Sequence, residues 1–340
     1  MSETSVPGDL PAAGDADRAV GMTVVIPAHN CEQYIEETIA SVEAQTLPPV
    51  EVIVVENASS DGSRELIAQL AEESHLKIRL VTTDCPGVSN ARNLGFSLAH
   101  TPLVAMLDAD DRYLPGFLNS ASEAFSQQPT LCLFFGNRRP LRDGEVVDEP
   151  FLERTGLPLL AFTPLAGDSR LISDGLFELL LRGSVVSCSG AVVRRSAAYR
   201  AGLFPISLSS SEDRCFFSRL ALEGPAAYTL APTHHYRSHS ASKTGSSGWL
   251  EIRRNMVRCL AQLQLDTLER GLTAAQREAL QQAFNQALAG FHYSAADNGL
   301  ASFLDARAWS RRAGLPVTRS PKLWLKAVKN SIGRQQPANI

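Results

Sequence analysis

The sequence has no pair of cysteines with the spacing of a zinc or redox site. Its six cysteines are scattered singly along 340 residues, and none forms a C-x-x-C. Isolated cysteines in a chain of this length predict a reducing compartment. Residues 1–21 lack the basic start and apolar stretch of a signal peptide, and no run approaches the roughly 18 apolar residues that would span a bilayer. We therefore expect a cytoplasmic protein with a disordered leader at 1–21.

Two common phosphate-binding loops are also missing. No G-x-G-x-x-G follows the first predicted strand, and the lysine of a P-loop is absent. These absences exclude the usual dinucleotide and triphosphate cradles. A nucleotide site in this chain must hold phosphate by other means, such as a bound cation.

Acidic residues are absent from Ala306 to the end of the chain. That stretch holds eight Lys or Arg, whereas residues 1–305 carry 24 basic and 36 acidic residues. The net charge of the whole chain is only −4, which predicts no nucleic-acid partner from bulk electrostatics. A hydrophobic fraction of 44% and a charged fraction of 20% are typical of a globular protein with a sizeable core.

Strand and helix patterns alternate over the first third of the chain. Short loops between them predict a doubly wound, Rossmann-like and mostly parallel α/β sheet. The predicted strands are 23–26, which Pro27 ends, 50–55, 78–81 and 103–107, and the predicted helices are 31–45, capped by Asn30, 63–73 and 87–98. A mixed pattern follows, with helices at 115–125, 174–182 and after Ser209, and strands at 131–135 and 189–193. Helices are predicted at 249–268, 274–297, 300–313 and 321–333, so we divide the chain into the leader, an α/β domain at 22–247 and a helical region at 248–340.

Polar loops follow three of the predicted strands, at 27–30, 56–61 and 108–111. Ligands of such sheets bind beyond the carboxyl ends of the strands. The carboxylates of Asp108, Asp110 and Asp111 repel one another, and a divalent cation that also binds phosphate relieves this repulsion. The alternative is an ordinary turn, because Asp is common in turns.

Six motifs, in order from Thr23 to about Ser242, resemble those of the inverting family 2 glycosyltransferases, which have the GT-A fold. The motifs are Val25 to Asn30, Val54 to Ser63, Gly87 to Asn93, Leu107 to Asp111 with its D-x-D, the pair Glu212-Asp213, and Tyr236 to His239 followed by Ser242. One departure is Glu56, since the family usually has Asp there. The resemblance implies attack by an acceptor hydroxyl on the anomeric carbon of a nucleotide-sugar, a UDP-sugar, with Mn²⁺ or Mg²⁺ as cofactor. It also implies a glycan or lipid-linked glycan as acceptor.

The resemblance also implies a role for each motif residue. Asp213 is the expected general base, and Glu212 the residue that orients the acceptor or a loop. The expected metal ligands are Asp108, Asp110 and His239. The expected contacts to the nucleotide-sugar are Pro27, Ala28, His29, Asn30, Glu56, Ser59, Asp61, Gly87, Arg92, Asp108, Ala109 and Asp110. Plainer roles stay open, namely a helix N-cap for Asp213, a turn cap for Asp61 and a structural histidine at His239.

Two other classes of protein compete with this interpretation. A nucleotidyltransferase shares such a sheet, but it usually carries a Gly-rich basic loop after the first strand, where this chain has Pro27 to Asn30. A non-catalytic binding protein on the same fold is disfavoured because both D-x-D carboxylates and the Glu212-Asp213 pair are present.

The last predicted helix is amphipathic and basic. Helical spacing places Trp324, Leu325, Val328 and Ile332 on one face, with Leu323 off this stripe, and Lys322, Lys326 and Lys329 on another. Such a helix is typical of peripheral association with an anionic membrane, here its inner face. The alternative is a last helix packed on the body with solvated lysines.

Overall fold

The computed structural model describes residues 20–142, 144–149, 151–238 and 248–333. One sheet runs through the α/β part, in the order β3-β2-β1-β4-β10-β6-β11-β9-β8, with β5 beside β11 and β7 beside β6. The strands are β1 Met22–Ala28, β2 Glu51–Glu56, β3 Ile78–Thr82, β4 Leu103–Met106, β5 Arg112–Tyr113, β6 Leu133–Arg142, β7 Glu145–Val146, β8 Thr163–Pro164, β9 Ser169–Ile172, β10 Ala191–Arg194 and β11 Ala226–Ser238.

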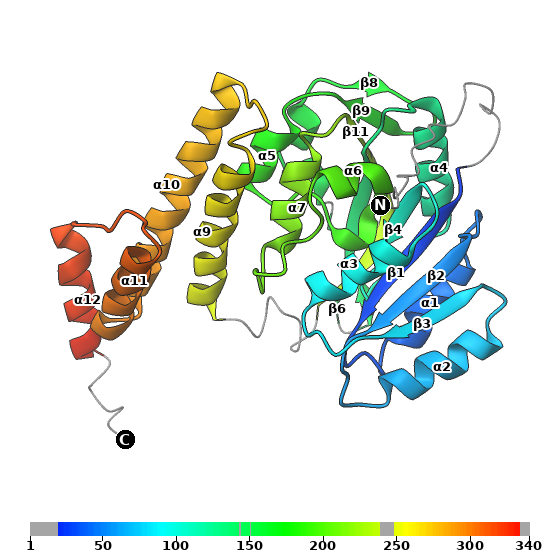
Figure 1. The fold of residues 1–340 in the computed structure, drawn as a ribbon, viewed down its shortest axis with the longest axis horizontal. Helices are drawn as coiled ribbons and strands as arrows, with labels where there is room; N and C mark the ends of the chain where they lie inside the picture. Colours follow the sequence, from blue (N-terminus) through cyan, green and yellow to red (C-terminus); the bar gives the residue numbers. More distant parts are fainter. Residues whose placement is uncertain (1–19, 143, 150, 239–247, 334–340) are drawn as a thin grey trace, which may run out of the picture.

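Helices cover both faces of this sheet, and a further group lies to one side (Figure 1). The helices of the α/β part are α1 Ile35–Glu43, α2 Ser63–Glu73, α3 Val88–Leu98, α4 Phe117–Gln127, α5 Leu176–Arg182, α6 Arg195–Arg200 and α7 Glu212–Leu220. The C-terminal helices are α9 Trp249–Asp266, α10 Ala274–Asp297, α11 Leu300–Arg312 and α12 Pro321–Gly333. None of the helices in the described ranges combines the length and the apolar character needed to cross a bilayer.

The predicted doubly wound sheet is confirmed in the first half of the chain. Strands β3, β2, β1 and β4 are parallel neighbours. The second half is mixed, because β10 runs antiparallel between β4 and β6, whereas β6 and β11 are parallel. The long pairing of β6 with β11 extends to Arg142 and Ser238, well past the predicted end of β6 at residue 135.

Two local predictions at the end of β1 were wrong. Pro27 does not end the strand, since Pro27 pairs with Val55 and the strand continues to Ala28. Asn30 does not cap a helix, because α1 begins at Ile35 after Tyr34. Asn30 instead adopts a left-handed φ of 48°, a conformation that Asn tolerates better than most residues. Its side chain accepts a hydrogen bond from the loop after β2 rather than from the N-terminus of α1.

The two faces of the sheet bury different helices because successive strand residues point to opposite sides. Val24 and Ile26 of β1 pack with residues of α1, α2 and α4. Val25, between them, packs with residues of α3, α5, α6 and α7. Helix α3 lies so close to β1 that a Cβ at Gly95 would stand 2.2 Å from a methyl group of Val25.

Helices α5 and α7 are shared by two cores. Phe216 of α7 belongs to the core of the sheet, whereas Cys215 belongs to the core of the C-terminal helices α9 to α12. Phe177 and Leu181 of α5 also pack into the second core. The C-terminal helices therefore rest on the outer side of α5 and α7, as Figure 1 shows.

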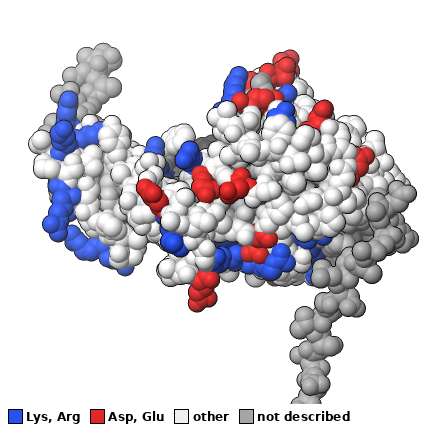
Figure 2. Space-filling model, turned by 90° about the horizontal axis from the view of Figure 1, so that it is seen from above, with Lys and Arg blue, Asp and Glu red and all other residues white. Residues whose placement is uncertain are grey.

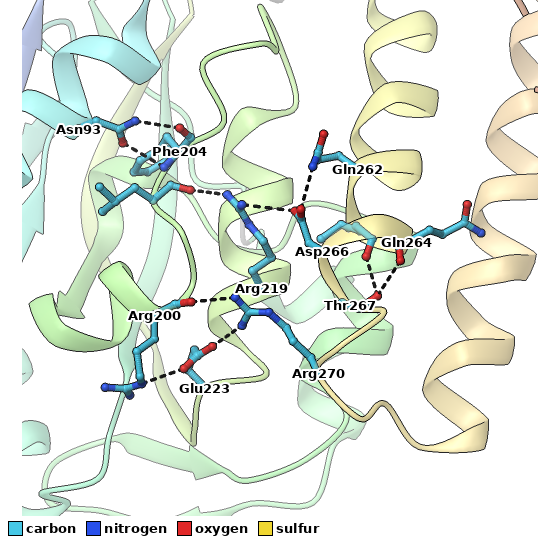
Figure 3. Close-up of polar contacts among 12 residues, drawn as sticks. Asn93, Arg200, Phe204, Arg219, Glu223, Gln262, Gln264, Asp266, Thr267 and Arg270 are labelled. Carbon is cyan, nitrogen blue, oxygen red and sulfur yellow. Dashed lines mark hydrogen bonds and ion pairs between the residues drawn. The ribbon is translucent and has the colours of Figure 1, made fainter. Parts of the chain in front are cut away.

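Charged side chains reinforce the contact between α7 and α9 (Figure 3). Arg219 of α7 pairs with Asp266 of α9 at 3.4 Å and donates to the carbonyl of Leu203. Just after α7, Glu223 pairs with both Arg200, at 2.9 Å, and Arg270. We call these residues the α7–α9 network.

The predicted faces of α12 were partly wrong. Ala327 is fully buried, and Leu323 and Trp324 pack with it against the other C-terminal helices. The Trp324 ring meets Phe303 of α11 edge-on, with centroids 5.3 Å apart. Leu325, which is 72% exposed, does not join them. Trp324 faces inward because the ring of Phe303 in α11 packs against it.

Candidate active site

The loops after β1 and β2 are held together by hydrogen bonds. The Asn30 Oδ1 accepts from the backbone N–H of Ser60 at 2.8 Å, and the Asn30 N–H donates to Ser59 Oγ at 3.1 Å. His29 Nδ1 lies 2.7 Å from the carbonyl oxygen of Asn57. Pro27 and Ala28 are the last residues of β1 and lie in the sheet. These two predicted loops therefore form one surface at the edge of the sheet.

Glu56 is buried at the end of β2 and organises its own loop. Its Oε1 accepts from the N–H of Ser59 at 2.6 Å, and its Oε2 accepts from Arg64 Nε at 3.1 Å. Burial raises the pKa of Glu56, but these hydrogen bonds outweigh burial and hold the pKa below its ordinary value. Glu56 is thus a carboxylate whose two oxygens already accept hydrogen bonds within the protein, at the position predicted to contact the base.

Asp61 makes its contacts within the same pair of loops. Its Oδ1 accepts from the N–H of Ser63 at 3.1 Å, and its Oδ2 accepts from the N–H of Glu32 at 3.3 Å. Burial raises the pKa of Asp61, and the hydrogen bonds from Ser63 and Glu32 lower it further than burial raises it. These contacts are those of a residue that caps a turn at the start of α2.

A third loop leads into α3 and brings Gly87 and Arg92 to the same edge. Gly87 has a φ of 109°, which favours glycine, and its N–H donates to Asn57 Oδ1 at 3.2 Å. One turn into the helix, the buried Arg92 donates to Asp108 Oδ1 at 2.7 Å and to Glu212 Oε1 at 3.2 Å. Arg92 therefore links the D-x-D loop directly to the start of α7.

The carboxylates of the loop after β4 have different surroundings. Asp108 and Asp110 are partly exposed, whereas Asp111 is 1% exposed. Asp111 accepts from Ser189 Oγ at 2.5 Å and from the N–H of Arg237 at 2.8 Å. Burial raises the pKa of Asp111 well above its ordinary value, and the charges of Asp110 and Asp108 raise it further. Asp111 thus anchors the loop, and Asp108 and Asp110 remain at its surface.

Two contributors to this site were absent from the predicted site residues. Ser189 Oγ also accepts from the N–H of Asp108 at 3.1 Å, so one hydroxyl fixes both ends of the D-x-D loop. Arg237 donates from Nε to the carbonyl of Asp110 at 2.9 Å and pairs with Glu37 at 2.7 Å. Arg237 lies in the Tyr236-to-His239 motif and was detectable there, whereas no sequence pattern distinguishes Ser189.

The predicted base lies at the start of α7. Asp213 is in the first turn of the helix, where the dipole favours a carboxylate, and its Oδ1 accepts from the N–H of Arg214 at 2.7 Å. Glu212 beside it is buried against Arg92. Ser211, which precedes α7, has a left-handed φ of 64° and no side-chain cap bond. The start of α7 is therefore attached to the D-x-D loop through Glu212 and Arg92, and Asp213 remains partly exposed.

The residues of the D-x-D loop fit a hard divalent cation. Carboxylate oxygens are the ligands that Mg²⁺ and Mn²⁺ prefer, together with water and phosphate oxygens. Besides burial, the negative charges of Asp110 and Asp108 raise the pKa of Asp111, and a bound cation would relieve this repulsion between carboxylates. Within the described ranges, three His, Cys, Asp or Glu side chains are nowhere grouped as a ready-made metal site. The third predicted ligand, His239, lies outside those ranges.

Comparison with known sequences identifies the family. The sequence profile of glycosyl transferase family 2 matches residues 23–198, slightly more than half of the chain. The chain therefore belongs to glycosyl transferase family 2, as the six motifs predicted.

Curated relatives match shorter stretches. An uncharacterized glycosyltransferase of Nostoc sp. is 38% identical over 31% of this chain and 32% of its own length. A putative teichuronic acid biosynthesis glycosyltransferase of Bacillus subtilis is 31% identical over 38% of this chain and 51% of its own length. The chain thus spans about a third to a half of the length of these relatives.

Solved structures share the fold over most of the chain. Residues 1–349 of TarS from Staphylococcus aureus, in complex with UDP-GlcNAc, give a TM-score of 0.61 at 17% identity, over 87% of this chain and 92% of that TarS chain. A mannosyltransferase of Pyrobaculum calidifontis, in complex with GDP-Man and Mn²⁺, gives a TM-score of 0.57 at 19% identity, over 97% of this chain and 85% of the mannosyltransferase chain. The predicted GT-A fold with a helical C-terminal region is thereby confirmed.

Proposed function

We propose that this protein is a metal-dependent, inverting glycosyltransferase that transfers a sugar from a nucleotide-sugar to a hydroxyl group. The observation that carries the proposal is the link from Asp108 through Arg92 to Glu212, with Asp213 next in the chain. This link joins residues suited to a metal-bound diphosphate with a carboxylate suited to act as base. Family membership favours this function over a nucleotidyltransferase and over a non-catalytic binding protein.

The two chemical tasks are divided between the two ends of this link. A cation held by Asp108 and Asp110, and by His239, would supply Lewis-acid stabilisation of the departing diphosphate. Asp213 removes the proton from the acceptor hydroxyl as its oxygen attacks the anomeric carbon. The bond from that carbon to the diphosphate breaks, and the configuration of the sugar inverts. Glu212 keeps the start of α7 against Arg92, which fixes the position of Asp213.

The proposed donor is a UDP-sugar, bound by the loops after β1 and β2 and by Gly87. The UDP-GlcNAc in the TarS structure supports UDP, and the GDP-Man and Mn²⁺ of the mannosyltransferase support a diphosphate bound with a metal. The proposed acceptor is a glycan or lipid-linked glycan of the cell surface. The names of two relatives, a teichuronic acid glycosyltransferase and a poly(ribitol-phosphate) β-N-acetylglucosaminyltransferase, support a polymer of this kind.

A donor screen tests this function. UDP-, GDP- and dTDP-sugars are incubated with the protein and Mn²⁺ or Mg²⁺, and nucleotide release is measured. We expect release from one class of donor, and we expect EDTA to abolish tight binding of the matching nucleotide in calorimetry. Nucleotide affinity that is unchanged in EDTA would contradict the metal dependence while leaving the transfer reaction open to measurement.

We further propose that the protein works at the inner face of an anionic membrane. Lys and Arg side chains gather along the end of the molecule formed by α11 and α12 (Figure 2). On α12, the exposed side chains of Leu325 and Val328 lie near the exposed Lys322 and Lys329. Lys326 adds less positive charge to this surface, because it forms an ion pair with Asp297 at 2.6 Å. An apolar pair flanked by lysines suits the headgroup region of a bilayer.

A further inference from the structure

The guanidinium group of Arg138 lies against two aromatic rings near the edge of the site. Its Cζ is 3.8 Å from the centroid of the Phe151 ring and 4.8 Å from that of Tyr236. Contacts of this kind orient a guanidinium group and leave its N–H groups available in the plane. We call these three residues the Arg138 cluster.

The cluster is built into the fold rather than formed by mobile side chains. Asn137, which is fully buried, precedes Arg138 in β6. Its Oδ1 accepts from the N–H groups of Phe151 and Leu152, at 3.3 and 3.1 Å. Its Nδ2 donates to Glu153 at 2.8 Å. These bonds hold the turn at 151–153 against β6 and so fix Phe151 on one side of Arg138.

Arg138 differs from the other arginines of β6 in its charge partners. Arg139 pairs with Asp148 at 3.0 Å, and Arg142 pairs with Glu149 at 3.3 Å. In the part of the chain that the structure describes, no carboxylate lies within 4.0 Å of the Arg138 nitrogens. Burial lowers the pKa of Arg138, and electrostatic interactions with Tyr236 and Asp111 offset this only in part. A half-buried cation without its own carboxylate is suited to receive an anion from a ligand.

The cluster borders the D-x-D loop. Tyr236 is followed in β11 by Arg237, which donates from its backbone to Asp111 at 2.8 Å and from Nε to the carbonyl of Asp110 at 2.9 Å. On its other side the cluster continues into the segment after β6, which carries none of the family motifs. Arg138 therefore lies between the loop assigned to the donor diphosphate and a segment that carries none of the family motifs.

We propose that the Arg138 cluster binds an anionic group, a phosphate or a carboxylate, carried by the acceptor. This inference rests on the proposed glycosyltransferase function and deepens it by naming the acceptor as a charged polymer. Guanidinium binds both anions through paired hydrogen bonds. The diphosphate of the donor has the same chemistry, so the experiment must separate the two sources.

The experiment compares Arg138→Gln with Arg139→Gln, a neighbour in the same strand that has its own carboxylate. Inorganic phosphate is the probe, and its binding is measured by calorimetry with Mg²⁺, both without nucleotide and with a saturating amount of the nucleoside diphosphate that binds best. We expect Arg138→Gln to weaken phosphate binding at least about tenfold in both conditions. We expect Arg139→Gln to change it less than about twofold, and nucleotide affinity to be the same in all three proteins.

Two outcomes would overturn the inference. Phosphate affinity that is unchanged in Arg138→Gln removes the anion site. A loss of nucleotide affinity in Arg138→Gln, with phosphate displaced by nucleotide, assigns Arg138 to the donor instead. Failure of every nucleotide to bind contradicts the proposed function, but the phosphate comparison without nucleotide still decides the role of Arg138. If Arg138→Gln unfolds, Arg138→Lys keeps the charge without the paired geometry and is expected to weaken phosphate binding by a smaller factor.

Discussion

The candidate active site and the α7–α9 network are built from the same kinds of side chain in opposite proportions. In the site, one arginine, Arg92, is shared by two carboxylates, Asp108 and Glu212. In the α7–α9 network, one carboxylate, Glu223, is shared by two arginines, Arg200 and Arg270, and Arg270 also donates to the backbone carbonyl of Arg200. The first arrangement has one more carboxylate than arginine, so it can bind a cation or a proton. In the second, the single carboxylate is already paired with two arginines. An excess of one charge is thus a better sign of function than the number of ion pairs.

Removing the shared residue of each network is the strongest test of this difference. Arg92→Met leaves Glu212 buried without its cation, and we expect a loss of about 3–5 kcal/mol in the free energy of unfolding. Glu223→Gln keeps a hydrogen-bonding side chain at a more exposed position, and we expect a loss of about 1 kcal/mol. Urea unfolding measures both.

A double variant shows whether the unpaired carboxylate is the cause. Arg92→Met with Glu212→Gln removes the buried charge, so we expect it to recover part of the loss. Nucleotide binding should weaken in both Arg92 variants and stay unchanged in Glu223→Gln. Equal losses of stability in Arg92→Met and Glu223→Gln would end the distinction between the two networks.

The two ends of α7 provide the second test. Asp213→Asn keeps the shape and an oxygen that can accept from the N–H of Arg214, but it removes the proposed base. We expect transfer to fall at least about 100-fold with nucleotide affinity nearly intact. Arg219→Met, at the other end of the helix, should lower stability and leave the turnover of the folded protein close to normal. A parallel collapse of nucleotide binding in Asp213→Asn would assign Asp213 to the donor site or to the fold.

Acid provides a third test, because the site side of the molecule contains a histidine that resists protonation. His234 is fully buried, and burial, with the charges of Arg138 and His235, lowers its pKa from 6.5 to about 3. The unfolded chain takes up this proton below pH 6.5 and the folded chain does not, so stability falls as the pH falls.

The size of this effect follows from the pKa. We expect His234 to lower the free energy of unfolding by about 2 kcal/mol at pH 5, and we expect this loss to be missing in His234→Phe. Urea unfolding at pH 7 and pH 5 measures it. His100→Gln, at an exposed position, is the control and should keep the wild-type pH dependence. An unchanged slope in His234→Phe would place the acid sensitivity elsewhere.

The smallest expected effect concerns the basic end of the C-terminal helices. Lys322→Gln with Lys329→Gln removes two exposed charges without disturbing the packing of Trp324. Each charge near an anionic surface is worth about 1 kcal/mol, so we expect binding to anionic liposomes at low salt to weaken about tenfold or more. Lys77→Gln with Arg79→Gln removes the same charge from the α/β part and should have little effect. Equal co-sedimentation of both double variants would return α12 to a purely structural role.

The sequence was most informative where local periodicity and long-range packing agree. Helices α2 and α10 were both predicted at the bounds that the structure gives. Strands β1 to β4 were predicted because their buried apolar runs alternate with helices of clear amphipathic pattern. The convergence of three polar loops followed from the parallel order of the strands.

The predictions that were wrong depend on partners far away in the chain. The residue type of Asn30 predicts a helix cap, but the loop after β2 supplies the N–H of Ser60 as its partner. The apolar stripe of α12 was assigned from the helix alone, whereas contact with Phe303 of α11 determines that Trp324 faces inward. Ser189 was not predicted because a single serine has no pattern until the fold brings it to Asp111.

The position of α7 between two cores has a consequence for how the molecule comes apart. A helix that fills both cores cannot be released from one of them while the other stays intact. The sheet and the C-terminal helices are then expected to lose their structure in a single cooperative transition, with Asp213 lost in the same step. Stability gained anywhere in the C-terminal helices is in that case stability of α7, the helix that carries the proposed base, however far the stabilising residue lies from Asp213.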